Sequence, residues 1–594
     1  MSTATHPQAH SSSGTTSSTT SNGKASKPGG DGEYSANSRS PLDVMLTDAS
    51  SSSLRRWGPG PEPLKFVAAL AKSPRRPAAR VAGLGKELGK IVLGRSEVAP
   101  SKKDKRFADP AWTENPVYSR LCQTYLAATA LAEGLVEDAD LDWRTRQRVA
   151  FLVENAVDAL APSNLPVSPP ALKAALDTGG KNFVRGGRRL IRDISRRPHI
   201  PQMVDSTPFT VGENIAITEG AVVLRTPVME LIQYRARTET VHARPLLMVP
   251  PMINKFYIAD LATDRSMAQF FLDSGQAVFM ISWRNPTEEH RDWSLDTYVQ
   301  AVLDALAAVE AIHGPDRGGD AAGVHLLGLC AGGITASVTV AHLAAKGELD
   351  RIASLTLGVT VLDQSRAGLI GSFVDEDAAQ ASIDESQRKG YLDGKALAGV
   401  FAWLRPNDLI WNYWVNNYLL GKPPPAFDVL FWNNDVTRMA AGLHRDFLRM
   451  AVHNKLADPG SMTVLGTPID LSKITVDTYL VAGIADHITP WHNNYKTIKL
   501  VGSRPRFVLS TSGHIAALVN PPGNPKSTWQ VNDALPDDPD EWLAGASTQK
   551  GSWWSDYVAW LAERSGGEVD APSEFGGAGY EAVIRAPGTY VHES

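Results

Sequence analysis

The segment from Val324 to Leu343 constrains the fold of this chain more than any other. It reads VHLLGLCAGGITASVTVAHL, an apolar run of strand character followed by a glycine-rich turn and then a run of helix character. This pattern predicts a sharp strand-to-helix turn that displays a nucleophile. The flanking glycines, Gly328, Gly332 and Gly333, suit a bend that has no room for β-carbons. Cysteine, at position 330, stands where serine is usual.

Such a turn places the sulfur of Cys330 at the N-terminus of a helix, where the helix dipole and free N–H groups favour the thiolate. The backbone amide of Ala331 is then expected to donate to an oxyanion. The alternative for Cys330 is a buried structural thiol, and that is the role we expect for Cys122, inside a predicted helix. Because these are the only two cysteines, the sequence favours a reducing, cytoplasmic compartment over a disulfide framework.

A cysteine nucleophile needs a base and a group that orients the base. Asp486 follows the predicted strand TYLVAG, and His514 follows the predicted strand RFVLS. Nucleophile, acid and histidine therefore occur in the chain order of the α/β-hydrolase fold. His487 competes for the role of base, but adjacent residues rarely point toward one partner, so the sequence favours His514.

The loop after the predicted strand PLLMV is expected to supply the second oxyanion donor. We assign that donor to the amide of Ile253. Asn254 either orients the loop or contacts substrate, and Lys255 is expected to be solvated.

Hydrophobic patterning divides the chain into three parts. Residues 1–60 are rich in Ser, Thr and Gly and are predicted to be a disordered tail. Residues 61–207 show helical spacing of apolar residues and predict an α-helical N-terminal domain. Residues 208–594 are predicted to be the α/β-hydrolase catalytic domain, with an aromatic-rich lid inserted at about 363–446.

Within the last part, short apolar runs alternate with helical runs, most clearly Leu295–Ile312 and Ile334–Lys346. Nearly all-apolar strands indicate a mostly parallel, doubly wound sheet that is covered on both faces. The predicted strands are Ile215–Ile217, Val222–Thr226, Met229–Tyr234, Pro245–Val249, Gln276–Ile281, Val324–Leu329, Ile352–Gly358, Thr478–Val481 and Arg506–Ser510.

Composition excludes several functional classes. The formal net charge is -5, with both signs interspersed, which gives no case for nucleic-acid binding. Apolar runs stay shorter than the roughly 18 residues that a membrane span requires, and the start of the chain lacks the apolar block of a secretory signal. Cysteine spacing typical of metal sites is absent, so no metal or resident cofactor is expected.

Several long blocks, including RPNDLIWNYW, NPPGNPK and GLCAGGITA, resemble the signature blocks of single-subunit polyhydroxyalkanoate synthases, classes I and II. The resemblance runs from about Pro208 to Glu563. It implies that Cys330 is the acylated nucleophile, His514 its general base and Asp486 the partner carboxylate. It leaves open whether Asp486 orients His514 or helps to deprotonate the incoming hydroxyl.

The resemblance also implies the substrates and partners. They are an (R)-3-hydroxyacyl-CoA, the growing polyester, a second copy in a homodimer, and the polymer granule with its phasin-type proteins. Coenzyme A belongs to the substrate, so no cofactor is implied. Trp414, in the aromatic lid, joins Asn254 and His487 as a candidate for substrate binding. The preferred acyl-chain length is not readable from the sequence.

Two other functions fit the same residues. An intracellular polyester depolymerase or an acyl-CoA thioesterase would use the same triad and deliver the acyl group to water. A catalytically silent granule-coating protein would not need Cys330 at all.

Overall fold

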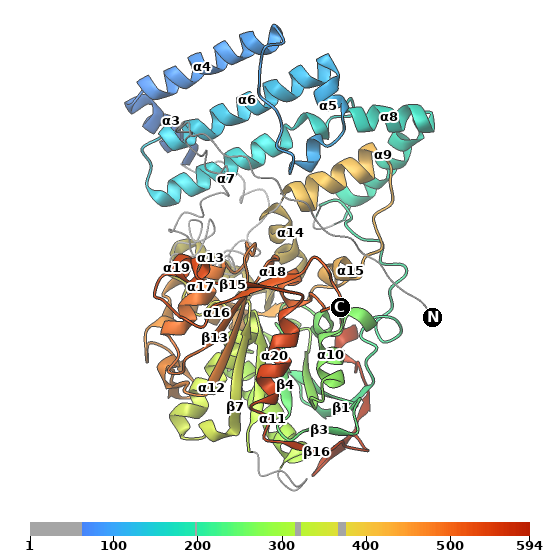
Figure 1. The fold of residues 1–594 in the computed structure, drawn as a ribbon, viewed down its shortest axis with the longest axis vertical. Helices are drawn as coiled ribbons and strands as arrows, with labels where there is room; N and C mark the ends of the chain where they lie inside the picture. Colours follow the sequence, from blue (N-terminus) through green and yellow to red (C-terminus); the bar gives the residue numbers. More distant parts are fainter. Residues whose placement is uncertain (1–61, 197–198, 315–321, 366–375, 405) are drawn as a thin grey trace, which may run out of the picture. The chain divides into compact units, whose positions relative to one another are not determined.

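The computed structural model describes residues 62–196, 199–314, 322–365, 376–404 and 406–594. Figure 1 shows these residues in colour along the sequence. The predicted tail at 1–60 lies outside the described residues. Among the described helices, none is long and apolar enough to cross a membrane.

Only helices occur in the first described part, up to Ile194, as predicted for an α-helical N-terminal region. They are α3 (Glu62–Lys72), α4 (Arg75–Val92), α5 (Ala111–Glu114), α6 (Pro116–Asp138), α7 (Trp143–Ala159), α8 (Pro169–Thr178) and α9 (Lys181–Ile194). The longest, α6, begins where the side chain of Asn115 accepts hydrogen bonds from two backbone amides of its first turn. Cys122 on α6 is 1% exposed and packs with Phe107 and Trp112, which confirms the predicted buried thiol.

The second part is built on an 11-stranded sheet with the order β15-β14-β13-β12-β7-β6-β4-β5-β2-β1-β19. Its members are β1 (Gly220–Arg225), β2 (Met229–Tyr234), β4 (Leu246–Val249), β5 (Val278–Trp283), β6 (Val324–Leu329), β7 (Ile352–Gly358), β12 (Asp477–Gly483), β13 (Arg506–Ser510), β14 (Thr528–Val531), β15 (Ser547–Lys550) and β19 (Ile584–Arg585). The six strands from β13 to β5 in this order are parallel. Antiparallel strands complete both edges.

This sheet confirms the predicted fold class, and all but one of the predicted strands form at or within a few residues of their predicted positions. The exception is Ile215–Ile217, which makes only an isolated bridge through Ile215 to Val211. Ala216 in the middle of this run has a positive φ of 55°, which breaks the extended backbone that a strand requires. The edge strands β14, β15 and β19 were not predicted because their residues are largely polar or half exposed.

Two apolar layers cover the sheet, one on each face. Along β4, Leu247 and Val249 belong to the layer that contains helices α11 (Leu295–His313) and α12 (Ala331–Lys346). Leu246 and Met248 belong to the other layer, with α10 (Met267–Asp273) and α20 (Trp553–Ala562). Since successive strand residues point to opposite faces, strands buried on both sides are apolar throughout.

Among the described residues between β7 and β12, where the sequence predicts the lid, the chain forms four α-helices. They are α13 (Glu376–Lys389), α14 (Gly394–Leu404), α15 (Asp428–Asn434) and α16 (Ala441–Val452). Between α14 and α15 the chain forms two π-helical stretches, η9 (Asn407–Trp411) and η10 (Trp414–Leu419). Such wide turns are rare and frequently occur at functional sites. The exact limits of the domains and of the lid stay predictions.

Helix α9 contacts η10 directly. A β-carbon on Gly186 would lie 1.8 Å from the carbonyl oxygen of Tyr418, so only glycine fits there. The Tyr418 hydroxyl donates to Asp193 at 2.9 Å, and the amide of Asn182 donates to the Leu419 carbonyl at 2.7 Å. The N-terminal helices therefore hold the π-helical part of the lid region through close backbone packing.

The neighbouring glycines of α9 allow a matched test of this contact. We expect Gly186→Ala to lower the midpoint of thermal unfolding, because overpacking against backbone costs about 1–3 kcal/mol. Gly187→Ala should leave the midpoint unchanged or raise it slightly, since a β-carbon there meets nothing within 4 Å and alanine favours helix. Equal midpoints for the two variants, measured by calorimetry, would contradict the contact.

Candidate active site

Cys330 lies at the predicted sharp turn, between the end of β6 and the start of α12. Its backbone has φ 50° and ψ -118°, a conformation that non-glycine residues rarely adopt. The glycines around it are required by space. A β-carbon on Gly328 would lie 2.5 Å from the Cα of Gly333, and one on Gly332 would lie 2.2 Å from the carbonyl oxygen of Val249. The strained turn therefore has the features expected of a nucleophile-bearing elbow.

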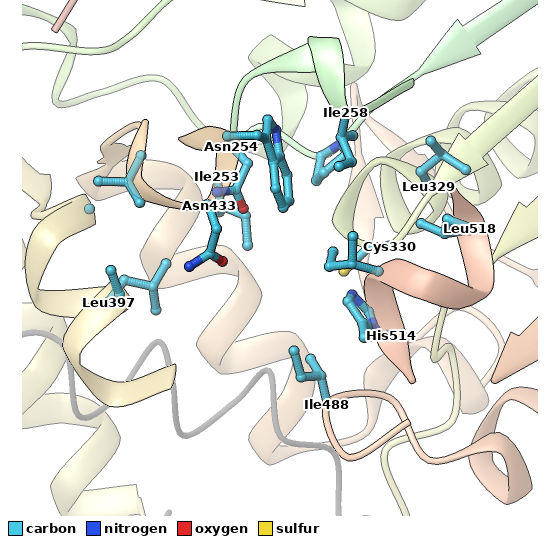
Figure 2. A pocket seen from close by; sticks show the side chains of 16 residues that line it. Ile253, Asn254, Ile258, Leu329, Cys330, Leu397, Asn433, Ile488, His514 and Leu518 are labelled. Atoms are coloured by element: carbon cyan, nitrogen blue, oxygen red, sulfur yellow. The ribbon is translucent and has the colours of Figure 1, made fainter. Parts of the chain in front are cut away.

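His514 and Asp486 come together beside this turn, each at the end of the strand that the sequence indicated. Nδ1 of His514 lies 2.7 Å from Oδ2 of Asp486, and both side chains are buried. The sulfur of Cys330 is close enough to the imidazole to help raise its pKa. Figure 2 shows the sulfur beside the His514 ring at one wall of a pocket. The three residues thus form a continuous Cys–His–Asp arrangement.

The Asp486 carboxylate is held from several directions. Oδ1 accepts from the backbone amides of Ile488 at 2.8 Å and Thr489 at 2.9 Å. Oδ2 accepts from the hydroxyl of Thr489 at 2.6 Å as well as facing His514. These contacts leave the carboxylate little freedom to turn away from the imidazole.

Electrostatics matches this geometry. Burial acts to lower the pKa of His514, but the charge of Asp486 and the sulfur of Cys330 outweigh it and raise the pKa to about 10. Burial acts to raise the pKa of Asp486, but His514 and Thr489 lower it below its usual value. At neutral pH the site therefore favours a protonated imidazole between a carboxylate and the sulfur of the nucleophile.

Of the two candidate bases, His514 is the one placed to act. It lines the pocket with Cys330, whereas His487, on the same loop as Asp486, does not. His487 is half-buried.

The two predicted oxyanion donors, Ala331 and Ile253, are both close to the nucleophile in the structure: Ala331 follows it in the chain, and Ile253 lines the same pocket. Ala331 is the first residue of α12, so its N–H has no acceptor within that helix. Ile253 and Asn254 line the pocket from the loop after β4. Thr437 fixes this loop, since its hydroxyl donates to the Met252 carbonyl at 2.9 Å.

The rest of the pocket is mainly apolar and draws on the lid region. Leu397 and Ala398 of α14, Trp432 and Asn433 of α15, and Ile488 also line it. Leu397 and Asn433 lie across the pocket from Cys330, and Ile488 lies near His514 (Figure 2). Asn433 and Asn254 add side-chain amides to an otherwise mainly apolar wall (Figure 2). Sequence reasoning missed Asn433 and Leu397, although Asn433 follows an aromatic run of the lid that was already recognised.

Trp414 lies away from this pocket. Its indole N–H donates to the carbonyl of Asn164 at 3.1 Å, and its ring packs edge-on against Trp411 and Tyr418. Its place is the contact between the N-terminal helices and the lid region, which gives no support to a role in substrate binding. In the described residues, no group of three or more His, Cys, Asp or Glu side chains could hold a metal ion.

Comparison with known proteins agrees with this architecture. Residues 103–271 match the family described as "Poly-beta-hydroxybutyrate polymerase (PhaC) N-terminus", and residues 252–521 match "alpha/beta hydrolase fold". Poly(3-hydroxyalkanoate) polymerase 1 of Ectopseudomonas oleovorans is 46% identical over 88% of this chain and 92% of its own length. The Poly(3-hydroxyalkanoate) polymerase subunit PhaC of Cupriavidus necator is 42% identical over 84% of this chain and 85% of its own length.

The chain belongs to the poly(3-hydroxyalkanoate) polymerase family. It is therefore an enzyme, and the resemblance found in the sequence blocks is confirmed. The N-terminal family match includes all of α5 to α9, so these helices belong to the family pattern, whereas α3 and α4 lie before the matched residues.

The raised pKa of His514 gives a direct prediction for this polymerase. In Asp486→Asn the raising charge is lost while burial remains, so the pKa of His514 should fall and the protonated imidazole beside Cys330 should be lost at neutral pH. We expect alkylation of Cys330 by iodoacetamide at pH 7 to slow by about 10-fold or more. Mass spectrometry of the labelled peptide measures this rate.

Cys122 is the internal control for that experiment. Burial raises its pKa to about 11, so it should stay unlabelled in both proteins. An unchanged rate at Cys330 would mean that Asp486 does not set the charge of the imidazole.

Proposed function

We propose that this enzyme links (R)-3-hydroxyacyl groups from coenzyme A thioesters into a polyester, through a thioester on Cys330, with release of coenzyme A. The observation that carries the proposal is the Cys330–His514–Asp486 arrangement, which opens onto an apolar pocket in a chain of the polymerase family.

The first step exchanges one thioester for another. The sulfur of Cys330 attacks the thioester carbonyl, and the amides of Ala331 and Ile253 stabilise the oxyanion. As the carbonyl re-forms, the bond to the coenzyme A sulfur breaks, and the imidazolium of His514 supplies the proton to that leaving group. Because a thioester replaces a thioester, the step is close to neutral in energy.

The second step transfers the acyl group to a hydroxyl. His514, now neutral, takes the proton of the 3-hydroxyl of another monomer or chain end, and the resulting oxygen attacks the Cys330 thioester. The ester forms, the bond to Cys330 breaks, and the thiolate again pairs with the protonated His514. Formation of an oxoester from a thioester is downhill and drives chain growth.

We assign Asp486 the role of orienting His514. Its oxygens are already engaged by His514, Thr489 and two backbone amides, and Asp486 does not line the pocket. A carboxylate in these surroundings stabilises the imidazolium and is poorly placed to meet an incoming hydroxyl directly.

The pocket favours transfer to a hydroxyl over transfer to water. Its volume is about 70 Å³, room for only a few water-sized groups, so the acyl portion enters while most of coenzyme A stays outside. Apolar walls, among them Leu397, Ile488 and Leu518, disfavour free water next to the thioester.

Further parts of the proposal concern partners and place. No resident cofactor takes part, since coenzyme A arrives with the substrate. We place the enzyme in the cytoplasm on the surface of the polymer granule, as a homodimer, beside phasin-type proteins.

The product distinguishes this polymerase from a depolymerase or thioesterase. Purified enzyme incubated with (R)-3-hydroxybutyryl-CoA should give polymer and free coenzyme A, measured by light scattering and a thiol reagent. Free hydroxy acid as the sole acyl product would reject the synthase. Cys330→Ala should abolish both signals, whereas a silent coating protein would show no difference between the variant and the parent chain.

A second test addresses the base. His514→Gln should suppress acylation of Cys330 by a slowly transferred substrate analogue, because the sulfur loses the imidazolium that stabilises its charged form. Intact-protein mass spectrometry detects the adduct. A normal adduct in this variant, together with its loss in His487→Gln, would move the role of base to His487.

A further inference from the structure

Lys255 is not solvated, contrary to the expectation from sequence. It ends the loop that carries Ile253 and Asn254, and it is only 3% exposed. Its ammonium donates to the backbone carbonyl of Glu593 at 2.5 Å. Burial lowers the pKa of Lys255, while the nearby charges of Asp435 and Glu593 oppose that shift. A buried ammonium needs such partners, so its position is tightly specified.

One side of this loop is held by the lid region. The indole of Trp432 donates to the carbonyl of Lys255 at 2.7 Å, and Asn254 forms an isolated antiparallel bridge with Val436. Trp432 also lines the pocket. These contacts fix the loop against α15 but not against the body of the sheet.

The other side of the loop is held by residues 589–593, which we call the strap. The strap is anchored on Glu230 of β2, a buried carboxylate that accepts from the amide of Thr589 at 2.9 Å, its hydroxyl at 2.7 Å and the amide of Tyr590 at 3.1 Å. The Tyr590 hydroxyl donates to the carbonyl of Thr226 at 2.7 Å. The strap thus has its own attachment to the sheet, independent of Lys255.

Arg284 and Asn285, just after β5, then fix the end of the strap. The Arg284 guanidinium pairs with the Glu593 carboxylate at 3.1 Å and lies 4.9 Å from the centre of the Tyr590 ring. Asn285 donates to the Glu593 carbonyl at 3.3 Å and accepts from the amide of Arg438 at 2.9 Å. Figure 1 shows the end of the chain near α15, in agreement with these contacts.

We propose that the strap positions the oxyanion loop: the Glu593 carbonyl, fixed by Arg284 and Asn285, holds Lys255 and thereby the backbone amide of Ile253. The inference rests on the proposed function, in which that amide stabilises the oxyanion. An oxyanion donor acts only when it is held near its final position before the reaction begins. Lys255 and Arg284 are positioning residues, because neither touches the reacting atoms.

The choice of lysine fits positioning better than stability. A buried charge is weak evidence for stability, because desolvation offsets much of the attraction, and an apolar side chain of similar size packs as well. What a buried ammonium provides is one defined geometry, since only one arrangement satisfies it.

Two variants and a control test the strap. Lys255→Met removes the ammonium from the loop. Arg284→Met loosens Glu593, and the Arg284 side chain that it replaces is 32% exposed. Lys499→Met is the control, because Lys499 pairs only with the exposed Asp537. With (R)-3-hydroxybutyryl-CoA we measure kcat and KM for coenzyme A release, and with iodoacetamide we measure alkylation of Cys330, which needs the thiolate but no oxyanion donor.

Lys255→Met should lower kcat by about 10- to 100-fold. This is a smaller loss than removal of an oxyanion donor itself would cause, because the amide of Ile253 is displaced and not removed. Arg284→Met should lower it by a few-fold. KM and the alkylation rate should stay within about 2-fold in both, and the double variant should be no slower than Lys255→Met, since both act through one contact. Lys499→Met should match the parent enzyme.

Other results overturn the inference. If Arg284→Met has the kcat of the parent enzyme, Glu593 does not position the loop. This variant tests the strap even if Lys255→Met does not fold. Parallel losses in kcat and alkylation would indicate general damage to the site. If the parent enzyme releases coenzyme A but makes no polymer, the proposed function fails while the strap is still tested by the rate of release.

Discussion

The hydrogen bond between Asp486 and Nδ1 of His514 determines how the rest of the site can work. Because the carboxylate is buried and held by backbone amides, the imidazole has one orientation, with its other nitrogen toward Cys330. The sulfur in turn has one position, since the strained backbone at Cys330 is enforced by glycines that touch neighbouring main chain. Cys330 thus lies beside an imidazole that is itself held by a carboxylate, whereas burial raises the pKa of the Cys122 thiol to about 11.

Three separate parts of the chain meet around this pair. The parallel strands bring the three residues together at their carboxyl ends, as in other doubly wound sheets. The lid region supplies apolar walls through Leu397 and Trp432, and also fixes the loop that carries Ile253. The strap at 589–593 fixes the same loop from the side of the sheet. The chain therefore surrounds one reactive sulfur with elements that are hundreds of residues apart in sequence.

The central sheet and the triad could be predicted because each leaves a local signal. Strands such as Leu246–Val249 are apolar on both faces. Cys330, Asp486 and His514 each follow a buried strand of the same sheet. Lys255 and Trp414 could not be placed in this way. A lysine in a loop normally reaches solvent, but Lys255 is buried against the distant residues Asp435 and Glu593. Trp414 was a candidate for substrate binding, but its partner, Asn164, lies in a helical region whose contacts leave no pattern in the sequence.

The missing side chain at Gly186 has an effect that extends beyond its own helix. Where two backbones touch without a side chain between them, there is no compressible layer to absorb movement. Helix α9 and residues 418–421 are joined in this way, and further hydrogen bonds tie them together. The helix just before this segment, α14, provides Gly394 and Leu397 to the wall of the pocket. The N-terminal helices are therefore connected to the wall of the pocket through rigid backbone contacts rather than through a layer of side chains.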